Sequence, residues 1–223
     1  MKETQTFLEG TVVNLCIPDI DRDVYDGHWH EWFNDPKITE YLIHGVHPLS
    51  CKQEAAIVKE EIERSDSILL TIRQKSSGKH IGVISLKRID HLNRNAEIGL
   101  VMGPYRILGA ALEAMALMTQ HGFDRLNLEK IYASQHEGLW KWVNTLELIG
   151  YRIEGFRQNF GIRNGLSYGV ISTGVTAGQF NSLKDARGGN VLLPSVEKLC
   201  QQRRQENLVD ELKEFLKTLH NNL

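Results

Sequence analysis

One predicted strand-to-helix turn constrains this chain more than any other segment. Residues 96–102 are typical of a strand, and residues 109–123 are typical of a helix. Between them, small residues leave backbone N–H groups free at the positive end of the helix dipole, where anionic oxygens bind. Gly109 and Ala111 leave room for a phosphate to approach the backbone, and Arg106 adds positive charge. The turn therefore predicts a binding loop for a diphosphate.

The spacing Arg106-x-x-Gly109-x-Ala111 resembles the Gln/Arg-x-x-Gly-x-Gly/Ala motif of the Gcn5-related N-acetyltransferase (GNAT) superfamily. The surrounding segments follow in the order of that family. They are similar to its fourth strand, its fifth strand and the turn into its sixth strand, at residues 96–99, 128–133 and 150–155. The resemblance covers residues 8–180, and residues 32–42 and 154–157 are similar to one branch of the family. That branch contains the ribosomal-protein N-terminal acetyltransferases and several amino-sugar acetyltransferases.

The resemblance implies that acetyl-coenzyme A (acetyl-CoA) is the acyl donor. In the family, a backbone N–H on the fourth strand commonly stabilises the thioester oxygen, and the loop binds the diphosphate. The matching strand residues are Leu100, Val101 and Met102, and the matching loop residues are Arg106, Ile107, Leu108, Gly109, Ala110 and Ala111. Acetyl transfer to an amine also needs a base, because the attacking nitrogen must be neutral.

The expected fold is α/β, with a mixed, mainly antiparallel central sheet, helices on both faces and a C-terminal helical extension. We expect an acetyltransferase domain over residues 1–180, and a linker with an amphipathic helix over 181–223. Alternating and β-branched segments predict strands, and a capping box at Ser50 predicts a helix to Arg64. The predicted strands are 11–17, 68–75, 80–90, 96–102, 130–134, 151–162 and 168–175, and the predicted helices are 19–33, a short one after Pro36, 50–64, 109–123, 139–149 and 195–223.

Composition limits the classes of partner. Lys and Arg number 26 against 28 Asp and Glu, a balance that argues against a broad nucleic-acid surface. No apolar run is long enough to cross a bilayer, so no membrane partner is expected. Three widely spaced cysteines, Cys16, Cys51 and Cys200, favour free thiols in the cytoplasm over disulfides or a metal site.

Glu97 is the predicted general base, because it lies on the strand that leads to the thioester. The alternative is a strand glutamate paired with a basic side chain. His136 follows the fifth strand and is a second predicted base, with a solvated loop histidine as its alternative.

Two positions depart from the family pattern. Leu139 stands where members usually carry an asparagine, and Leu146 stands where many carry the tyrosine that protonates the departing thiolate. Three tyrosines are substitutes between which the sequence does not choose: Tyr105, Tyr132 and Tyr151.

The acceptor site is predicted near an aromatic, histidine-rich segment that contains His28, Trp29 and Trp32. Aromatic rings there would stack on a sugar or a base. The alternative is that the tryptophans are core residues at helical spacing. No metal is expected at His28, His30, His44 and His47, because no standard ligand spacing is completed.

The sequence therefore predicts an N-acetyltransferase that transfers the acetyl group of acetyl-CoA directly to a primary amine in a ternary complex. A small molecule such as a nucleotide-linked amino sugar is the first prediction for the acceptor. A peptide N-terminus is the alternative, and a catalytically weak acyl-CoA-binding regulator is a third reading, given Leu139 and Leu146. The apolar stripe of the last helix suggests either packing on its own domain or a homodimer contact.

Overall fold

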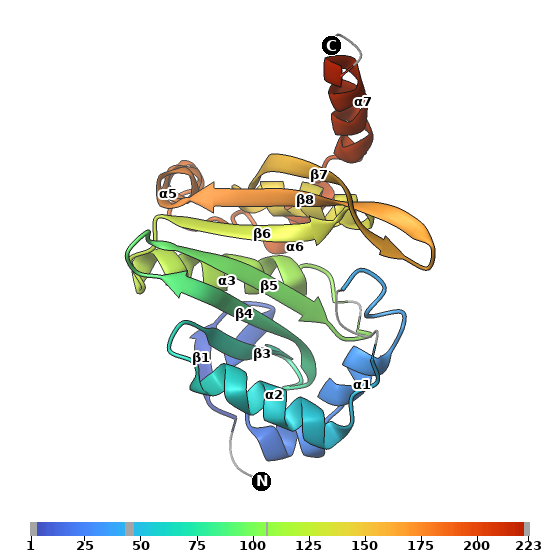
Figure 1. Cartoon of the computed structure of the whole chain (residues 1–223). Helices are drawn as coiled ribbons and strands as arrows, with labels where there is room; N and C mark the ends of the chain where they lie inside the picture. The colour runs from blue at the N-terminus through green and yellow to red at the C-terminus, as the bar shows by residue number, and fades with distance from the viewer. Residues whose placement is uncertain (1–3, 43–46, 106, 221–223) are drawn as a thin grey trace.

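The computed structural model describes residues 4–42, 47–105 and 107–220, and its described part contains a single eight-stranded sheet (Figure 1). The strands lie in the order β1-β2-β3-β4-β5-β6-β8-β7, and the pairing of β5 with β6 is parallel while the other described pairs are antiparallel. Their bounds are β1 Thr6–Glu9, β2 Val13–Cys16, β3 Ile68–Gln74, β4 His80–Asp90, β5 Asn95–Met102, β6 Lys130–His136, β7 Arg152–Arg163 and β8 Leu166–Thr176. The predicted mixed, mainly antiparallel sheet is confirmed.

The sheet opens between β5 and β6. These strands pair only from Asn95 opposite Lys130 to Glu97 opposite Tyr132. Beyond that point β5 stays paired with β4 as far as Met102, and β6 stays paired with β8 as far as His136. The two halves of the sheet therefore separate, and the second half of β5 presents an unpaired edge to the opening.

Helices cover both faces, as predicted. α3 (Ala110–Asp124) packs on one face in the largest apolar cluster, while α1 (Trp29–Asn34) and α2 (Cys51–Glu63) pack on the other (Figure 1). α4 (Trp140–Leu146) is flanked by short 3-10 turns, and three more helices follow β8: α5 (Ala177–Ala186), α6 (Val196–Gln201) and α7 (Leu208–His220). None of the helices in the described ranges is both long and apolar enough to cross a bilayer.

Local signals in the sequence located several boundaries correctly. The Ser50 hydroxyl accepts from the Gln53 N–H at 3.3 Å, and the Gln53 side chain accepts from the Ser50 N–H at 2.9 Å, which completes the predicted capping box. Asn164 and Gly165 both have positive φ, 51° and 77°, as a tight turn between β7 and β8 requires.

Three predictions about secondary structure were wrong, and two elements were missed. The helix expected over 19–33 is divided into a π-helical turn at Asp21–Tyr25 and α1. Between them lies Gly27, where a Cβ would clash with the Asp23 carbonyl oxygen. The segment after Pro36 forms turns instead of a helix. β1 and α5 were not predicted. The C-terminal helix is broken between Gln201 and Leu208, where the Asn144 side-chain amide holds two carbonyl groups.

The residues after β8 are not a simple appendage. Phe180 of α5 packs against Phe123, with ring centroids 5.6 Å apart, and Val191 and Val196 are buried in the main core. α7 projects from the body in Figure 1, and its Val209 packs in a small cluster with α4 and β8. Farther along the helix, Phe215 is 60% exposed. Only the first turns of α7 therefore pack back on the domain.

Glu54 on α2 provides a first testable prediction. It is buried, and burial raises the pKa of its carboxyl from 4.5 to about 7. Between these values the folded protein binds a proton that the unfolded chain does not, so this group weakens stability as pH rises through that window. Glu54→Gln removes the charge, so we expect it to raise Tm by a few degrees at pH 8 and to leave Tm nearly unchanged at pH 5. Thermal unfolding of both proteins across this range checks the prediction, and an equal shift at both pH values would contradict it.

Candidate functional site

The predicted diphosphate loop ends at Gly109, directly before α3. Gly109 has a φ of 80°, a left-handed conformation that favours glycine, and a Cβ there would lie 2.7 Å from Val196 Cγ1. The first N–H groups of α3 have no partner within the helix, and the helix dipole adds positive potential. Conformation and close packing thus both require glycine at the entrance to this helix. Arg106, predicted to add charge to the loop, lies outside the described residues.

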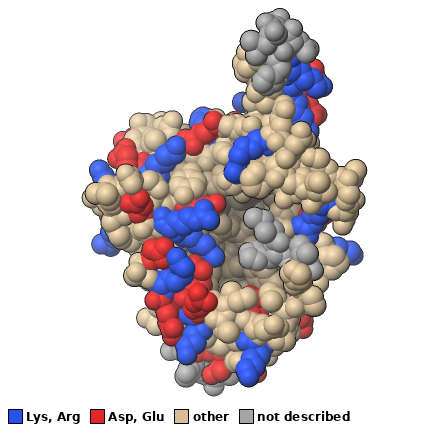
Figure 2. Space-filling view, in the orientation of Figure 1, with Lys and Arg blue, Asp and Glu red and all other residues tan. Residues whose placement is uncertain are grey.

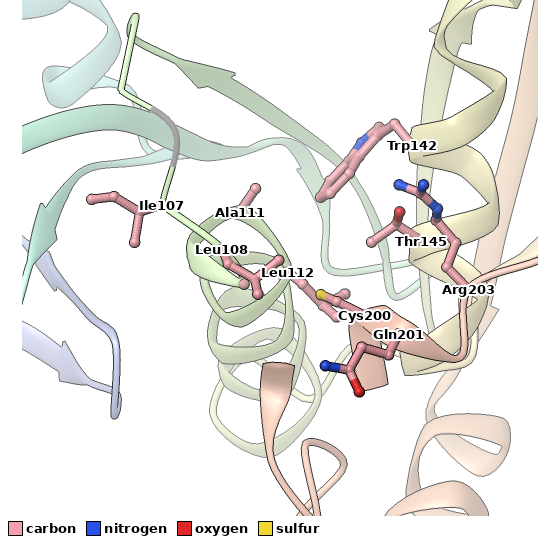
Figure 3. Close-up of a pocket in the computed structure, with 10 residues that line it drawn as sticks. Ile107, Leu108, Ala111, Leu112, Trp142, Thr145, Cys200, Gln201 and Arg203 are labelled. Atoms are coloured by element: carbon pink, nitrogen blue, oxygen red, sulfur yellow. The ribbon is translucent and has the colours of Figure 1, made fainter. Parts of the chain in front are cut away.

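A cavity of about 510 Å³ lies against this loop, and we call it the loop cavity (Figure 3). Among the predicted cofactor residues, four line it: Ile107, Leu108, Gly109 and Ala111. Ala110 is fully buried in the core, and its N–H donates to the Ile107 carbonyl at 3.3 Å. Across from the loop, Trp142 and Thr145 come from α4, and Cys200, Gln201 and Arg203 come from the C-terminal segment.

The edge of β5 offers backbone donors to the opening in the sheet. The Gly103 N–H donates to the Ile81 carbonyl at 2.9 Å, and opposite residues of an antiparallel pair alternate between hydrogen-bonded and non-bonded positions. Val101 therefore directs its N–H toward β4, while Leu100 and Met102 direct theirs toward the opening. Of the three predicted oxyanion donors, these two have the right direction.

A second cavity, of about 800 Å³, lies over the opposite face of the sheet, and we call it the sheet-face cleft. Ala96 and Ile98 point into the core with α3, so the alternation of side chains turns Glu97 to this other face. Figure 2 shows a hollow in this side of the molecule with basic side chains at its edge. The sheet-face cleft thus lies along β5 and β6, and the loop cavity lies beside the start of α3, which packs on the other face of the sheet.

Glu97 lines the sheet-face cleft and also pairs with Arg88. Its Oε2 lies 2.8 Å from Arg88 Nη1, and the Glu97 side chain is 28% exposed. Arg88 is 73% exposed, so it does not cover the Glu97 carboxylate on the side of the cleft. Glu97 therefore lines the cleft, and it also forms the ion pair of the alternative interpretation.

His136 lines the same cleft, but its hydrogen bonding does not suit a base. Its Nδ1 accepts from the Gly138 N–H at 2.9 Å, and its ring stacks on Tyr168 with centroids 4.4 Å apart. Burial lowers the pKa of His136, which favours the neutral ring. With Nδ1 already accepting, the proton of the neutral ring is on Nε2, so the ring can donate but has no free lone pair for a substrate ammonium.

One of the three substitute tyrosines faces the cleft. Tyr132 lines it and lies opposite Glu97 in the parallel pairing of β5 and β6. Tyr151 is fully buried and bonds to Thr119, and burial raises the pKa of its hydroxyl far above the usual value. Tyr105 packs against Trp32 and under the Lys79 ammonium, away from both cavities.

The predicted aromatic wall is formed by other residues. Trp29 and Trp32 are 2% and 3% exposed and belong to the α1–α2 core, so their predicted contact with the acceptor is not supported by their position. His28 is exposed and pairs with Glu31 at 2.8 Å. Besides Tyr132, the rings that line the cleft are Tyr41, His136, Phe160 and Tyr168. The sequence signal for them was the alternation on both sides of the Asn164-Gly165 turn.

Within the described ranges, no group of three or more His, Cys, Asp and Glu side chains is arranged to hold a metal ion. His44 lies outside the described residues.

Comparisons with known proteins agree with this geometry. Residues 15–152 match the family described as "Acetyltransferase (GNAT) domain". Spermidine N(1)-acetyltransferase of Escherichia coli is 26% identical over 121 residues, which are 54% of this chain and 65% of that protein. The chain therefore aligns with somewhat less than two thirds of that relative. An uncharacterized N-acetyltransferase of Bacillus licheniformis is 26% identical over 145 residues, which are 63% of this chain and 78% of that protein.

Solved structures show the same fold. Spermidine N-acetyltransferase of Vibrio cholerae, in complex with CoA and spermine, has a TM-score of 0.69 at 20% identity, and the match covers 77% of this chain and 99% of that one. A Gcn5-related N-acetyltransferase of Brucella melitensis has a TM-score of 0.68 at 20% identity, over 90% of this chain and 95% of its own.

The split sheet, the glycine-bearing loop before α3 and the two opposed cavities define a GNAT-type acyltransferase fold. The chain belongs to the GNAT acetyltransferase family. The predicted class and the predicted fold are confirmed. The named relatives are spermidine acetyltransferases, so they do not support the narrower prediction of the ribosomal-protein and amino-sugar branch.

Proposed function

We propose that this protein transfers the acetyl group of acetyl-CoA to the primary amine of a small molecule that also carries negative charge. The observation that carries the proposal is the charge balance of the sheet-face cleft. Its acidic residues are already paired, Glu97 with Arg88 and Glu154 with Lys130, each at 2.8 Å. Two further basic residues, Arg157 and Arg163, line the cleft without a carboxylate partner among the described residues. A phosphate would neutralise the charge of these guanidinium groups and accept hydrogen bonds from their planar N–H donors.

A polyamine fits this cleft poorly, although spermidine is the substrate named for several relatives. A polycation gains affinity from unpaired carboxylates and loses it near unpaired cations. Here the unpaired charges in the described lining are arginines. At 26% and 20% identity these relatives support the family and the fold. The acceptor depends on the side chains of this chain's own cleft.

The cleft suits a sugar or nucleotide more than a peptide. Phe160 and Tyr168 lie with ring centroids 6.4 Å apart, and Tyr41 lies 4.9 Å from His136. An aromatic and basic cleft of this kind can stack on a ring and bind a phosphate, whereas an acidic open groove would favour a peptide N-terminus. A nucleotide-linked amino sugar therefore remains the first proposal within this class of acceptor.

The proposed mechanism is direct transfer across the opening in the sheet. Glu97, directly or through a water, takes the proton of the acceptor ammonium, and the neutral nitrogen attacks the thioester carbon. The N–H groups of Leu100 and Met102 stabilise the oxyanion, and collapse of the tetrahedral species expels the CoA thiolate. Tyr132 is the proposed donor of a proton to that thiolate. None of the three cysteines lines the sheet-face cleft, so no covalent acetyl-enzyme is proposed.

A panel of amines tests the proposal by amine-dependent release of CoA. We expect kcat/KM to be highest for a nucleotide-diphosphate amino sugar, lower by about tenfold or more for the same amino sugar without its nucleotide, and lowest for spermidine. Arg157→Ala should raise KM for the nucleotide-linked sugar about tenfold, since a charge-assisted contact is lost, and should leave the free sugar unchanged.

Arg152 is the matched control, because it lies on the same strand but outside the cleft. Arg152→Ala should leave both substrates unchanged. Preference for spermidine over the anionic amines would overturn the proposed acceptor class. Absence of CoA release with every amine would favour the regulator instead.

A further inference from the structure

The C-terminal segment forms one wall of the loop cavity. The family match ends at residue 152, and α6 with its following turn lies beyond it. Val196 and Leu199 are buried, and Val196 packs directly beneath Gly109. Cys200, Gln201 and Arg203 then line the cavity opposite the loop (Figure 3). Residues expected to be a linker and a surface helix thus complete a cavity whose other walls belong to the family domain.

Arg203 is the one charged side chain among the described residues that line this cavity. Its Nε is buried and has no hydrogen-bond partner. The neighbouring cations are occupied: Arg204 Nε lies 3.6 Å from Glu147 Oε2, and Lys213 pairs with Glu137. A buried guanidinium nitrogen without a hydrogen-bond partner, at the edge of a mainly apolar cavity, favours an anionic ligand.

The backbone that carries Arg203 is held in place. The Asn144 side-chain amide of α4 donates to the Arg204 carbonyl at 3.0 Å and to the Glu206 carbonyl at 2.9 Å. Figure 3 shows the Arg203 side chain extending along α4 toward Thr145 and Trp142. The guanidinium is therefore pre-positioned beside an indole ring, and pre-positioning lowers the entropy that binding would cost.

We propose that Arg203 binds the 3′-phosphate of CoA, and that the C-terminal segment closes the nucleotide end of the donor site. This inference rests on the proposal that acetyl-CoA is the donor. The Ala110 N–H donates to the Ile107 carbonyl at 3.3 Å, so the N–H groups of Ala111 and Leu112 at the start of α3 supply the donors for the diphosphate. The 3′-phosphate lies on the ribose, beyond the diphosphate, and needs a separate cation. Arg203 supplies that cation, and Trp142 offers an aromatic surface for the adenine.

Calorimetric titration with acetyl-CoA and with its 3′-dephospho form tests the assignment. We expect Arg203→Ala to weaken acetyl-CoA binding about tenfold or more and to leave dephospho-acetyl-CoA within about threefold, so that the variant no longer distinguishes the two ligands. Arg204→Ala is the matched control, since it removes the neighbouring charge, which lies outside the cavity. It should bind both ligands as the unmodified protein does. Circular dichroism confirms that both variants are folded.

The outcomes separate this inference from the proposed function. Equal weakening of both ligands by Arg203→Ala, or weakening of neither, overturns the 3′-phosphate assignment while acetyl-CoA binding by the unmodified protein stands. Absence of acetyl-CoA binding by the unmodified protein overturns the donor proposal and this inference together.

The rate at which a thiol reagent modifies Cys200 tests independently where the nucleotide binds. It is half-buried in the cavity wall, whereas Cys16 is buried in the core. In a Cys51→Ser background, acetyl-CoA should slow modification of Cys200 by a thiol reagent at least about tenfold when the ligand is near saturation. The protection should need a higher acetyl-CoA concentration in Arg203→Ala. An unchanged modification rate at saturating acetyl-CoA would place the nucleotide elsewhere and contradict the inference.

Discussion

Replacing Glu97 with glutamine is expected to lower kcat about a hundredfold, the range that general base catalysis contributes. Glutamine keeps the size of the side chain and a hydrogen-bonding oxygen, but it cannot take a proton from the acceptor ammonium. The affinity for acetyl-CoA should be unchanged, because the loop cavity lies on the other face of the sheet. Steady-state kinetics of CoA release, with binding of acetyl-CoA measured separately, checks the prediction.

The ion pair with Arg88 makes a control necessary, since a loss of activity could reflect a structural role. An exposed pair contributes about 0–1 kcal/mol, so Glu97→Gln should change Tm little. Glu154 is a matched carboxylate in the same cleft, paired with Lys130 in the same way. Glu154→Gln should keep kcat within a few-fold. If kcat falls equally in the two variants, the loss comes from removing any negative charge in the cleft. Glu97 would then no longer be the proposed base.

The strand-to-helix turn of the predicted donor site could be located from the sequence because it is local. The loop before α3, the small residues it needs and the following helix are contiguous, so one short motif indicates them. The same is true of the Ser50 capping box and the turn at Asn164. In each case the physical reason lies within a few residues of the feature.

The acceptor side could not be predicted in the same way, because its wall is assembled from distant segments. The sheet order brings His136 of β6 beside Tyr168 of β8, and the turn that contains Tyr41, before α2, packs against them. Trp29 and Trp32 have the same chemistry, yet they fill the core under α2. A sequence shows which side chains can stack on a ligand, but burial decides which of them are available.

The break before α7 has a similar cause. The segment 195–223 carries an apolar pattern that continues through the break, so the sequence predicts one helix. The chain turns between α6 and α7, and there the Asn144 amide, 60 or more residues away in the chain, holds two backbone carbonyls. The position of Arg203 at the loop cavity depends on this long-range contact.

Glu113 carries the largest expected effect on stability, and it connects the fold to the donor site. It lies in the first turn of α3, is 1% exposed, and accepts four hydrogen bonds from the other end of the domain. The backbone N–H groups of Thr11, Val12 and Val13 donate at 2.7 Å, and the Thr11 hydroxyl donates at 2.5 Å. The carboxylate therefore joins the start of β2 to the helix whose N-terminus carries the diphosphate loop.

Glu113→Ala leaves these donors without a partner, so we expect the free energy of unfolding to fall by about 3–5 kcal/mol, as when one partner of a buried charged group is removed. For a chain of this size such a loss lowers Tm by roughly 10 °C. Glu113→Gln should be destabilising as well, because its amide NH₂ would face other N–H donors.

Gln120 lies on an exposed face of the same helix, and Gln120→Ala should stay within about 0.5 kcal/mol of the unmodified protein. Denaturant unfolding of the three variants checks these values. A loss below about 1 kcal/mol in Glu113→Ala would show that water replaces the carboxylate, and β2 would then not depend on α3 for its position.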